Sequence, residues 1–170
     1  MIGRFDSGAS RLDRMIERLL TQRACLRFAA DAIEGLPGPV LELGLGKGRT
    51  YDYLRQARPD REIIAFDREI HAPPDCVPDA AHLVLGEFIS TLPAFAKRPG
   101  PPAALVHADI GSEKPERDRR LAAAVAPLIT ALSQTGTIVI TDRAMADEGW
   151  HSLPLPNDAG RWDYYIYRVG

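Results

Sequence analysis

The segment with the clearest capacity for chemistry is the glycine-rich run VLELGLGKGRT at residues 40–50. It places three glycines at every second position, Gly44, Gly46 and Gly48. Glycine allows a tight turn and lets the backbone approach a ligand closely. The dinucleotide fingerprint G-x-G-x-x-G would require a glycine at position 49, where Arg49 stands. The run therefore predicts a ligand-binding turn that departs from the nicotinamide pattern.

An acid, Glu42, lies two residues before the first of these glycines. A carboxylate at this point repels a pyrophosphate but suits a cation. S-adenosylmethionine carries both a sulfonium and an ammonium group, so Glu42 is a sensible counter-charge for it. The alternative is a tight turn whose glutamate is merely solvated.

Two further positions fit the same ligand. Asp67 follows a second apolar run, about 20 residues after the glycines, where an acid is placed to accept hydrogen bonds from ribose hydroxyls. Gly86, Glu87 and Phe88 follow a third apolar run, where an acid beside an aromatic ring can meet an adenine. The alternatives are a capping or surface aspartate at 67, and a loop glutamate with a core phenylalanine at 87–88.

The elements that must position these residues alternate between short apolar runs and helical patterns. Helices are predicted at 10–34 with Ser10 as N-cap, at 50–58, at 90–96 and after Pro115. Strands are predicted at 39–43, 62–66, 82–85, 103–108, 137–141 and 162–169. His107, inside the fourth strand, is expected to be a core histidine whose nitrogens are satisfied.

This alternation predicts a Rossmann-like three-layer α/β sandwich with a mostly parallel sheet and an N-terminal helical extension. The last strand, rich in tyrosine, is expected to be an antiparallel edge. Through Tyr164, Tyr165 and Tyr167 it could pair across a homodimer, or it could simply pack. We expect one domain over 1–170, with a helical segment at 1–35, a cofactor-binding core at 36–143 and a C-terminal strand region at 144–170.

Composition excludes several classes of protein. A formal net charge of −2, from 21 basic and 23 acidic residues, gives no field for nucleic acid or an anionic membrane. The two cysteines exclude a disulfide scaffold and a zinc finger. The N-terminus has no apolar signal-peptide core and no run is long enough to span a bilayer, so a cytoplasmic protein is expected.

The successive segments ELGLGKG, AFDRE, LVLGEF, VHADIGS and VITDRA resemble the motifs of class I S-adenosylmethionine-dependent methyltransferases. The resemblance runs from about residue 36 to 143 and is closest to small stand-alone bacterial members. It implies that the cofactor is S-adenosyl-L-methionine. Its methionine half would lie against Glu42, Gly44, Leu45, Gly46 and Gly48. Asp67 and Arg68 would hold its ribose, and Gly86, Glu87 and Phe88 would meet its adenine.

The same resemblance places Asp109, at the end of the fourth strand, where the methyl group is presented, and makes it the candidate catalytic base. Asp109 and Asp142 could together hold magnesium, as in metal-dependent O-methyltransferases. Arg143 is a poor neighbour for a cation, so no metal is expected. Asp142 and Arg143 are instead candidate substrate residues, with Arg143 binding an anionic group.

The chain also departs from the family pattern. The stretch 142–161 is short and contains Pro154, Pro156 and Gly160, so the helix that usually precedes the closing hairpin is expected to be missing. The N-terminal helix could cover the site instead, with Phe5, Arg14 and Arg23 as candidates. Trp150 and His151 could border the substrate mouth, with surface packing as the alternative.

The sequence therefore predicts methyl transfer to an oxygen or nitrogen of a small molecule by in-line displacement. A module that binds the adenosyl cofactor without turnover is the first alternative. A nicotinamide oxidoreductase with an altered fingerprint is the second. No nucleic-acid or membrane partner is expected.

Overall fold

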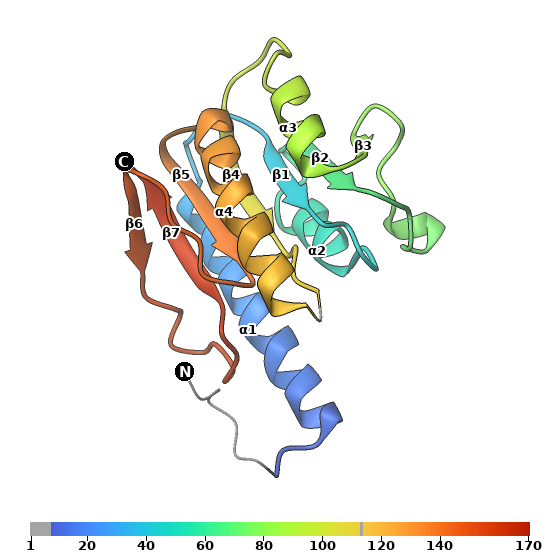
Figure 1. The fold of residues 1–170 in the computed structure, drawn as a ribbon, viewed down its shortest axis with the longest axis vertical. Helices are drawn as coiled ribbons and strands as arrows, with labels where there is room; N and C mark the ends of the chain where they lie inside the picture. Colours follow the sequence, from blue (N-terminus) through green and yellow to red (C-terminus); the bar gives the residue numbers. More distant parts are fainter. Residues whose placement is uncertain (1–7, 113) are drawn as a thin grey trace.

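The computed structural model describes residues 8–112 and 114–170, which form one seven-stranded sheet with helices on both faces (Figure 1). The strand order is β3-β2-β1-β4-β5-β7-β6. The strands are β1 (Val40–Leu43), β2 (Ile63–Asp67), β3 (Leu83–Leu85), β4 (Ala103–Ala108), β5 (Ser133–Thr141), β6 (Trp150–Leu153) and β7 (Tyr165–Val169). The first five are parallel, and β7 runs antiparallel to both β5 and β6. The predicted fold class is confirmed.

The helices divide between the two faces of the sheet. They are α1 (Arg11–Ala32), α2 (Arg49–Ala57), α3 (Phe88–Phe95) and α4 (Pro115–Leu132), with a short 3-10 turn, η1 (Pro74–Cys76). One apolar core joins α1 and α2 to the sheet, and a second joins α3 and α4 to its other face. None of the described helices combines the length and apolar character needed to cross a membrane.

Helix α1 begins where the sequence predicts. The Ser10 hydroxyl accepts a hydrogen bond from the Asp13 amide at 3.0 Å, and the Asp13 carboxylate accepts one from the Ser10 amide at 3.1 Å, which forms a capping box. The buried residues of α1 all lie from Thr21 onward. The first half of the helix extends beyond the sheet (Figure 1) and leaves Leu12 and Met15 largely exposed.

Two expectations about the C-terminal region differ from the structure. The sequence analysis missed β6, because Trp150–Leu153 is half-exposed and lacks a buried apolar run. Since β7 pairs with β5 on one side and β6 on the other, it is not an edge strand. The expectation of dimer pairing through β7 is therefore wrong, because its backbone is already paired. The helix expected to be missing is indeed absent from residues 142–149.

Gly44 follows the end of β1 and packs against the backbone that follows β4. Its φ of +92° is a backbone conformation that other residues rarely adopt. A Cβ atom placed there would lie 2.3 Å from the carbonyl oxygen of Asp109. Only glycine therefore allows the chain to leave β1 beside the end of β4.

We expect Gly44→Ala to lower the free energy of unfolding by at least about 2 kcal/mol, since left-handed strain and a backbone clash add together. Gly46→Ala is the matched control. Gly46 also has a positive φ, +50°, but a Cβ there meets nothing within 4 Å, so it should cost only about 1 kcal/mol. Urea unfolding of both variants measures the difference. Equal losses would contradict the close approach described here.

Candidate active site

A cavity of about 670 Å³ lies at the carboxyl ends of the central strands, and we call it the strand-end pocket. In open α/β sheets, ligands bind beyond these strand ends, and the volume lies within the range of small-molecule sites, about 300–1,000 Å³. Its floor and one side come from strand ends and the loops that follow them, including Gly44, Leu45, Gly46, Asp67, Arg68, Glu87, Phe88 and Asp109. Its other walls come from α1 (Met15, Arg18, Leu19, Gln22) and α4 (Arg117, Asp118, Arg120, Leu121, Ala124).

The Asp67 carboxylate is held at the rim of the pocket by two backbone amides. Its Oδ2 accepts a hydrogen bond from the Gly46 amide at 2.9 Å, and its Oδ1 accepts one from the Arg68 amide at 2.7 Å. A carboxylate has about four acceptor positions, so two stay available. Half-buried Asp67 can therefore hold a diol such as the two ribose hydroxyls.

The loop after β3 supplies the pocket's next wall. Phe88 packs partly against the core and lines the pocket together with Glu87 and Ile89. Ile89 is half exposed and adds apolar surface to this wall. An apolar wall with a carboxylate at its edge suits an aromatic heterocycle that carries an amino group, such as adenine.

Two of the predicted glycines shape the turns without lining the pocket. A Cβ at Gly48 would lie 2.6 Å from the carbonyl oxygen of Cys76, so this glycine lets η1 pack under the loop. The Gly86 amide donates to the Asp67 carbonyl at 2.9 Å and fixes the turn after β3. Both therefore act on the pocket through its shape.

Glu42 does not line the pocket either, which corrects the expected direct contact with the ligand's cation. Its side chain is fully buried below the glycine loop. One carboxylate oxygen accepts a hydrogen bond from the Thr50 hydroxyl, and the other lies 2.8 Å from His107 Nδ1. Both oxygens are thus engaged inside the fold, and the carboxylate faces the protein interior.

From Glu42 a buried chain of polar contacts runs to the pocket wall. His107 Nε2 lies 2.6 Å from the Tyr164 hydroxyl, which also accepts a hydrogen bond from the Gln22 amide at 3.1 Å. The same Gln22 amide donates to Asp109 Oδ2 at 2.9 Å. This buried relay, from Glu42 through His107, Tyr164 and Gln22 to Asp109, joins β1, β4, the start of β7 and α1. The expectation of a satisfied core histidine at 107 is confirmed.

Two groups of the relay have shifted pKa values. Burial opposes the charged form of His107, but the charge and hydrogen bond of Glu42 outweigh it, so the pKa of His107 is raised. Burial and the charge of Asp109 raise the pKa of Tyr164 well above its ordinary value, which keeps its hydroxyl neutral.

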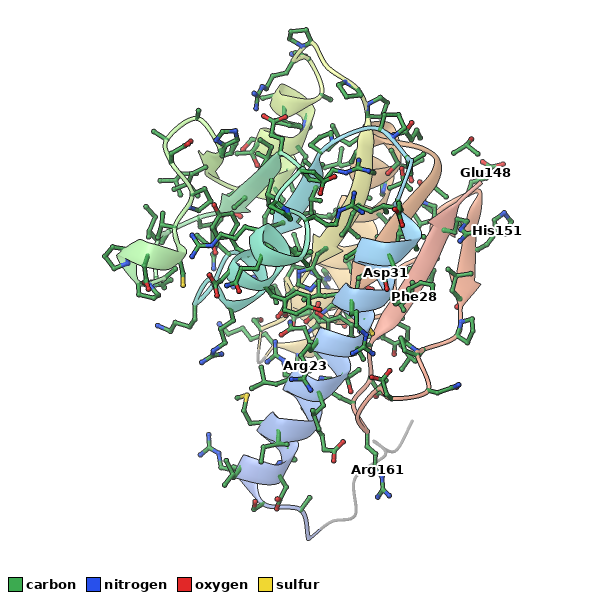
Figure 2. The ribbon with its side chains drawn as sticks, turned by 180° about the vertical axis from the view of Figure 1, so that it is seen from behind. Arg23, Phe28, Asp31, Glu148, His151 and Arg161 are labelled. Carbon is green, nitrogen blue, oxygen red and sulfur yellow. The ribbon has the colours of Figure 1, made fainter. Side chains whose placement is uncertain are left out.

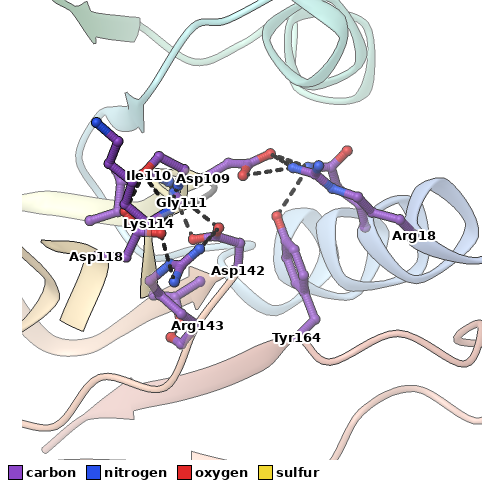
Figure 3. A network of polar contacts seen from close by, with 12 residues as sticks. Arg18, Asp109, Ile110, Gly111, Lys114, Asp118, Asp142, Arg143 and Tyr164 are labelled. Atoms are coloured by element: carbon purple, nitrogen blue, oxygen red, sulfur yellow. Dashed lines mark hydrogen bonds and ion pairs between the residues drawn. The ribbon is translucent and has the colours of Figure 1, made fainter. Parts of the chain in front are cut away.

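Asp109 lies in the pocket wall as predicted, but it is not a free carboxylate (Figure 3). The Arg18 Nη2 atom lies 2.9 Å from each of its oxygens, and Gln22 supplies a third hydrogen bond. The pair is partly shielded from solvent, with 35% of the Arg18 side chain and 19% of the Asp109 side chain exposed. Asp109 thereby fixes the pocket-facing side of α1.

Asp142 and Arg143 lie beside the pocket but do not line it (Figure 3). Asp142 accepts hydrogen bonds from the Ile110 and Gly111 amides at 3.2 and 3.0 Å. Burial and the nearby charge of Asp109 raise its pKa. Arg143 pairs with Asp118 at 3.2 Å and with Asp142 at 3.3 Å. The two residues brace the loop after β4, and their contact with substrate stays a prediction.

Other expectations fall outside the pocket or outside the described residues. Arg14 and Arg23 do not line the pocket, and Phe5 lies outside the part of the chain that the structure describes. Trp150 and His151 belong to β6 at the outer edge of the sheet, where Figure 2 labels His151. Among residues 8–112 and 114–170, no group of three or more His, Cys, Asp or Glu side chains is arranged to hold a metal ion.

The pocket also contains residues of α1 and α4 that the sequence did not predict as site residues. Met15, Arg18 and Gln22 follow helical i, i+3, i+7 spacing, which places them on one face of α1. The spacing could have indicated that these residues share a helix face. The sequence does not show, however, which face of the helix lies against the strand ends.

Comparisons with known proteins agree on a family. The family described as S-adenosyl-L-methionine methyltransferase matches residues 9–169. The crystal structure of S-adenosyl-L-methionine methyl transferase from Silicibacter pomeroyi DSS-3 is 45% identical, with a TM-score of 0.89, over 95% of this chain and 99% of that one.

More distant structures share the fold alone. Human methyltransferase-like protein 13, solved with S-adenosylhomocysteine, is 10% identical with a TM-score of 0.55, over 90% of this chain and 81% of that one. TrmN from Thermus thermophilus is 16% identical with a TM-score of 0.59, over 88% of this chain and 52% of that one. A search of curated proteins found no match.

The buried relay predicts a specific dependence of stability on pH. Because the pKa of His107 in the folded protein lies above the unfolded value of about 6.5, the folded protein keeps a proton that the unfolded chain has released. The stability from the Glu42–His107 pair is complete below about pH 6.5 and is lost as pH rises through the folded pKa.

Replacing His107 by glutamine should remove this decline, whose slope for one proton is at most about 1.4 kcal/mol per pH unit. The replacement should also lower the free energy of unfolding at pH 6 by about 3–5 kcal/mol, because it leaves Glu42 without its partner. His151→Gln, on exposed β6, is the control and should keep the wild-type slope. Urea unfolding between pH 5.5 and 9 measures both. An unchanged slope in His107→Gln would show that this pair does not titrate on unfolding.

Proposed function

The chain belongs to the S-adenosyl-L-methionine methyltransferase family, and we propose that its strand-end pocket binds that cofactor and passes the methyl group to an oxygen or nitrogen of a small molecule. Members of this family depend on S-adenosylmethionine, so the alternative of a nicotinamide oxidoreductase is not supported. The choice of acceptor class is our proposal.

One observation supports this placement of the cofactor: an open backbone turn, a carboxylate with available acceptor positions and an apolar wall all line the same cavity. Gly46 leaves open space above an exposed backbone turn, and Asp67 keeps acceptor positions available beside it. Phe88 and Ile89 add an apolar wall. We assign the methionine half to the Gly44–Gly46 turn, the ribose to Asp67 and the adenine to Glu87, Phe88 and Ile89.

When bound, the cofactor would supply an electrophilic methyl group, whose bonding electron pair would stay on sulfur while the acceptor gained the methyl group and lost a proton. This chain's residues orient the two reactants and exclude water. Alignment of this kind can contribute about 7–11 kcal/mol to the lowering of a barrier. Met15 and Leu19 of α1 contribute apolar side chains to the pocket wall, which helps to exclude water.

Asp109 is our proposed catalytic residue for the acceptor's proton. Its oxygens accept three hydrogen bonds from Arg18 and Gln22, so of its roughly four acceptor positions about one stays available for the proton of the acceptor molecule. Before that step, the same contacts make Asp109 the residue that positions Arg18 at the reacting end of the pocket.

A small acceptor is supported by the size of the cavity. At about 670 Å³, with walls from α1 and α4, it falls within the range of small-molecule sites. Its volume suits a cofactor together with a compact second substrate.

Asp67→Ala should weaken binding of S-adenosylhomocysteine at least tenfold, and about a hundredfold if both ribose hydroxyls lose their acceptor, since one hydrogen bond to a charged group is worth roughly 1.5–3 kcal/mol. Asp60→Ala is the control, because Asp60 forms a surface ion pair with Arg58 away from the pocket. Isothermal titration calorimetry measures both, and NAD should not bind wild type. Wild-type affinity in Asp67→Ala would refute the ribose assignment.

A further inference from the structure

The side of the pocket formed by α1 and α4 is rich in apolar side chains. Met15 and Leu19 of α1 are exposed apolar residues that line the pocket, and Leu12 lies on the same helix face one turn further out, 68% exposed. Leu121 and Ala124 of α4 also line the pocket. An apolar track therefore leads from the pocket along α1 toward solvent.

The charges around this track are unbalanced. Six basic residues line the pocket, Arg18, Lys47, Arg49, Arg68, Arg117 and Arg120, against four acidic ones. The whole chain carries a net charge of −2, so this excess of positive charge is local. Clefts lined by one sign of charge concentrate ligands of the opposite sign.

Three of these six basic residues already have an acidic partner, since Arg18 pairs with Asp109, Arg68 with Glu87 and Arg120 with Glu116. The other three, Lys47, Arg49 and Arg117, form no ion pair within the described part of the chain. Asp118 is bound by Arg143 and by Ser112, and Asp109 is bound by Arg18 and Gln22. Arg117 forms no ion pair or hydrogen bond within the described part of the chain, and only its charge acts on Asp118.

Arg18 is held in a defined position with donors to spare. Only its Nη2 atom contacts Asp109, and a guanidinium has five N–H groups. An arginine fixed by one carboxylate and facing a cavity is prearranged to bind a second anion through its remaining donors.

From these observations we propose that the methyl acceptor is an amphipathic anion. Its carboxylate or phosphate group would lie near Arg18 and Arg117, and its apolar body would lie along Met15, Leu19 and Leu121. This inference rests on the proposed function, since it concerns the second substrate of the same pocket. The net positive charge of S-adenosylmethionine would add to the attraction for an anion and to the repulsion of a cation.

The test uses wild-type protein saturated with S-adenosylhomocysteine and four probes that share a six-carbon chain: hexanoate, hexyl phosphate, hexylamine and hexan-1-ol. Calorimetry should show both anions, or one of them, binding at least about tenfold more tightly than the amine and the alcohol. Which anion binds more tightly distinguishes a carboxylate from a phosphate acceptor.

Two pairs of variants locate the binding. Arg117→Gln should weaken anion binding several-fold, whereas Arg119→Gln should not, since Arg119 is also exposed on α4 but pairs with Glu116 outside the pocket. Leu19→Ser should weaken it, whereas Leu20→Ser should not, because both leucines are 37% exposed and only Leu19 lines the pocket.

Several outcomes would overturn the inference. These are equal binding of all four probes, a preference for the amine, no binding of any probe, or anion binding that S-adenosylhomocysteine displaces, since the basic groups would then serve the cofactor's own carboxylate. In each case S-adenosylhomocysteine still binds. Failure of S-adenosylhomocysteine to bind wild type would instead refute the proposed function.

Discussion

The burial of one carboxylate, Glu42, is the constraint on which the rest of this site depends. An ionised side chain removed from water costs several kcal/mol unless it is paired and hydrogen-bonded. The fold meets this requirement with Thr50 at the start of α2 and His107 in β4. Because the two partners come from different elements, the glycine turn between them is fixed to both the helix and the neighbouring strand.

The buried relay connects Glu42 to the pocket wall through hydrogen bonds. Tyr164 and Gln22 extend the contacts of His107 to Asp109, which in turn binds Arg18. Helix α1 is thereby held over the strand ends by polar contacts as well as by the packing of its second half. The helix that usually precedes the closing hairpin in the family is absent between β5 and β7, as the sequence predicts, and α1 supplies a wall of the pocket.

The sequence was sufficient for the five parallel strands, though not for β6, and for the residues whose position follows from local spacing. Short apolar runs predicted the five parallel strands, and distance from the glycine turn predicted the position of Asp67 at the pocket. Contacts between distant segments could not be read in this way. Arg18 and Gln22 bind Asp109 across 91 and 87 residues, and on their own helix they resemble a solvated face. The spacing also could not tell that Glu42 turns inward, because that depends on His107 lying opposite it.

The central claim, that the adenosyl cofactor lies across these strand ends, is tested most directly by titrating ¹⁵N-labelled protein with S-adenosylhomocysteine and following the backbone amide signals. The account predicts the largest shifts at Gly46, Arg68 and Ile89, with the amides of Trp150–Leu153 on β6 unmoved. Shifts that spare the glycine turn, or that centre on β6, would contradict it.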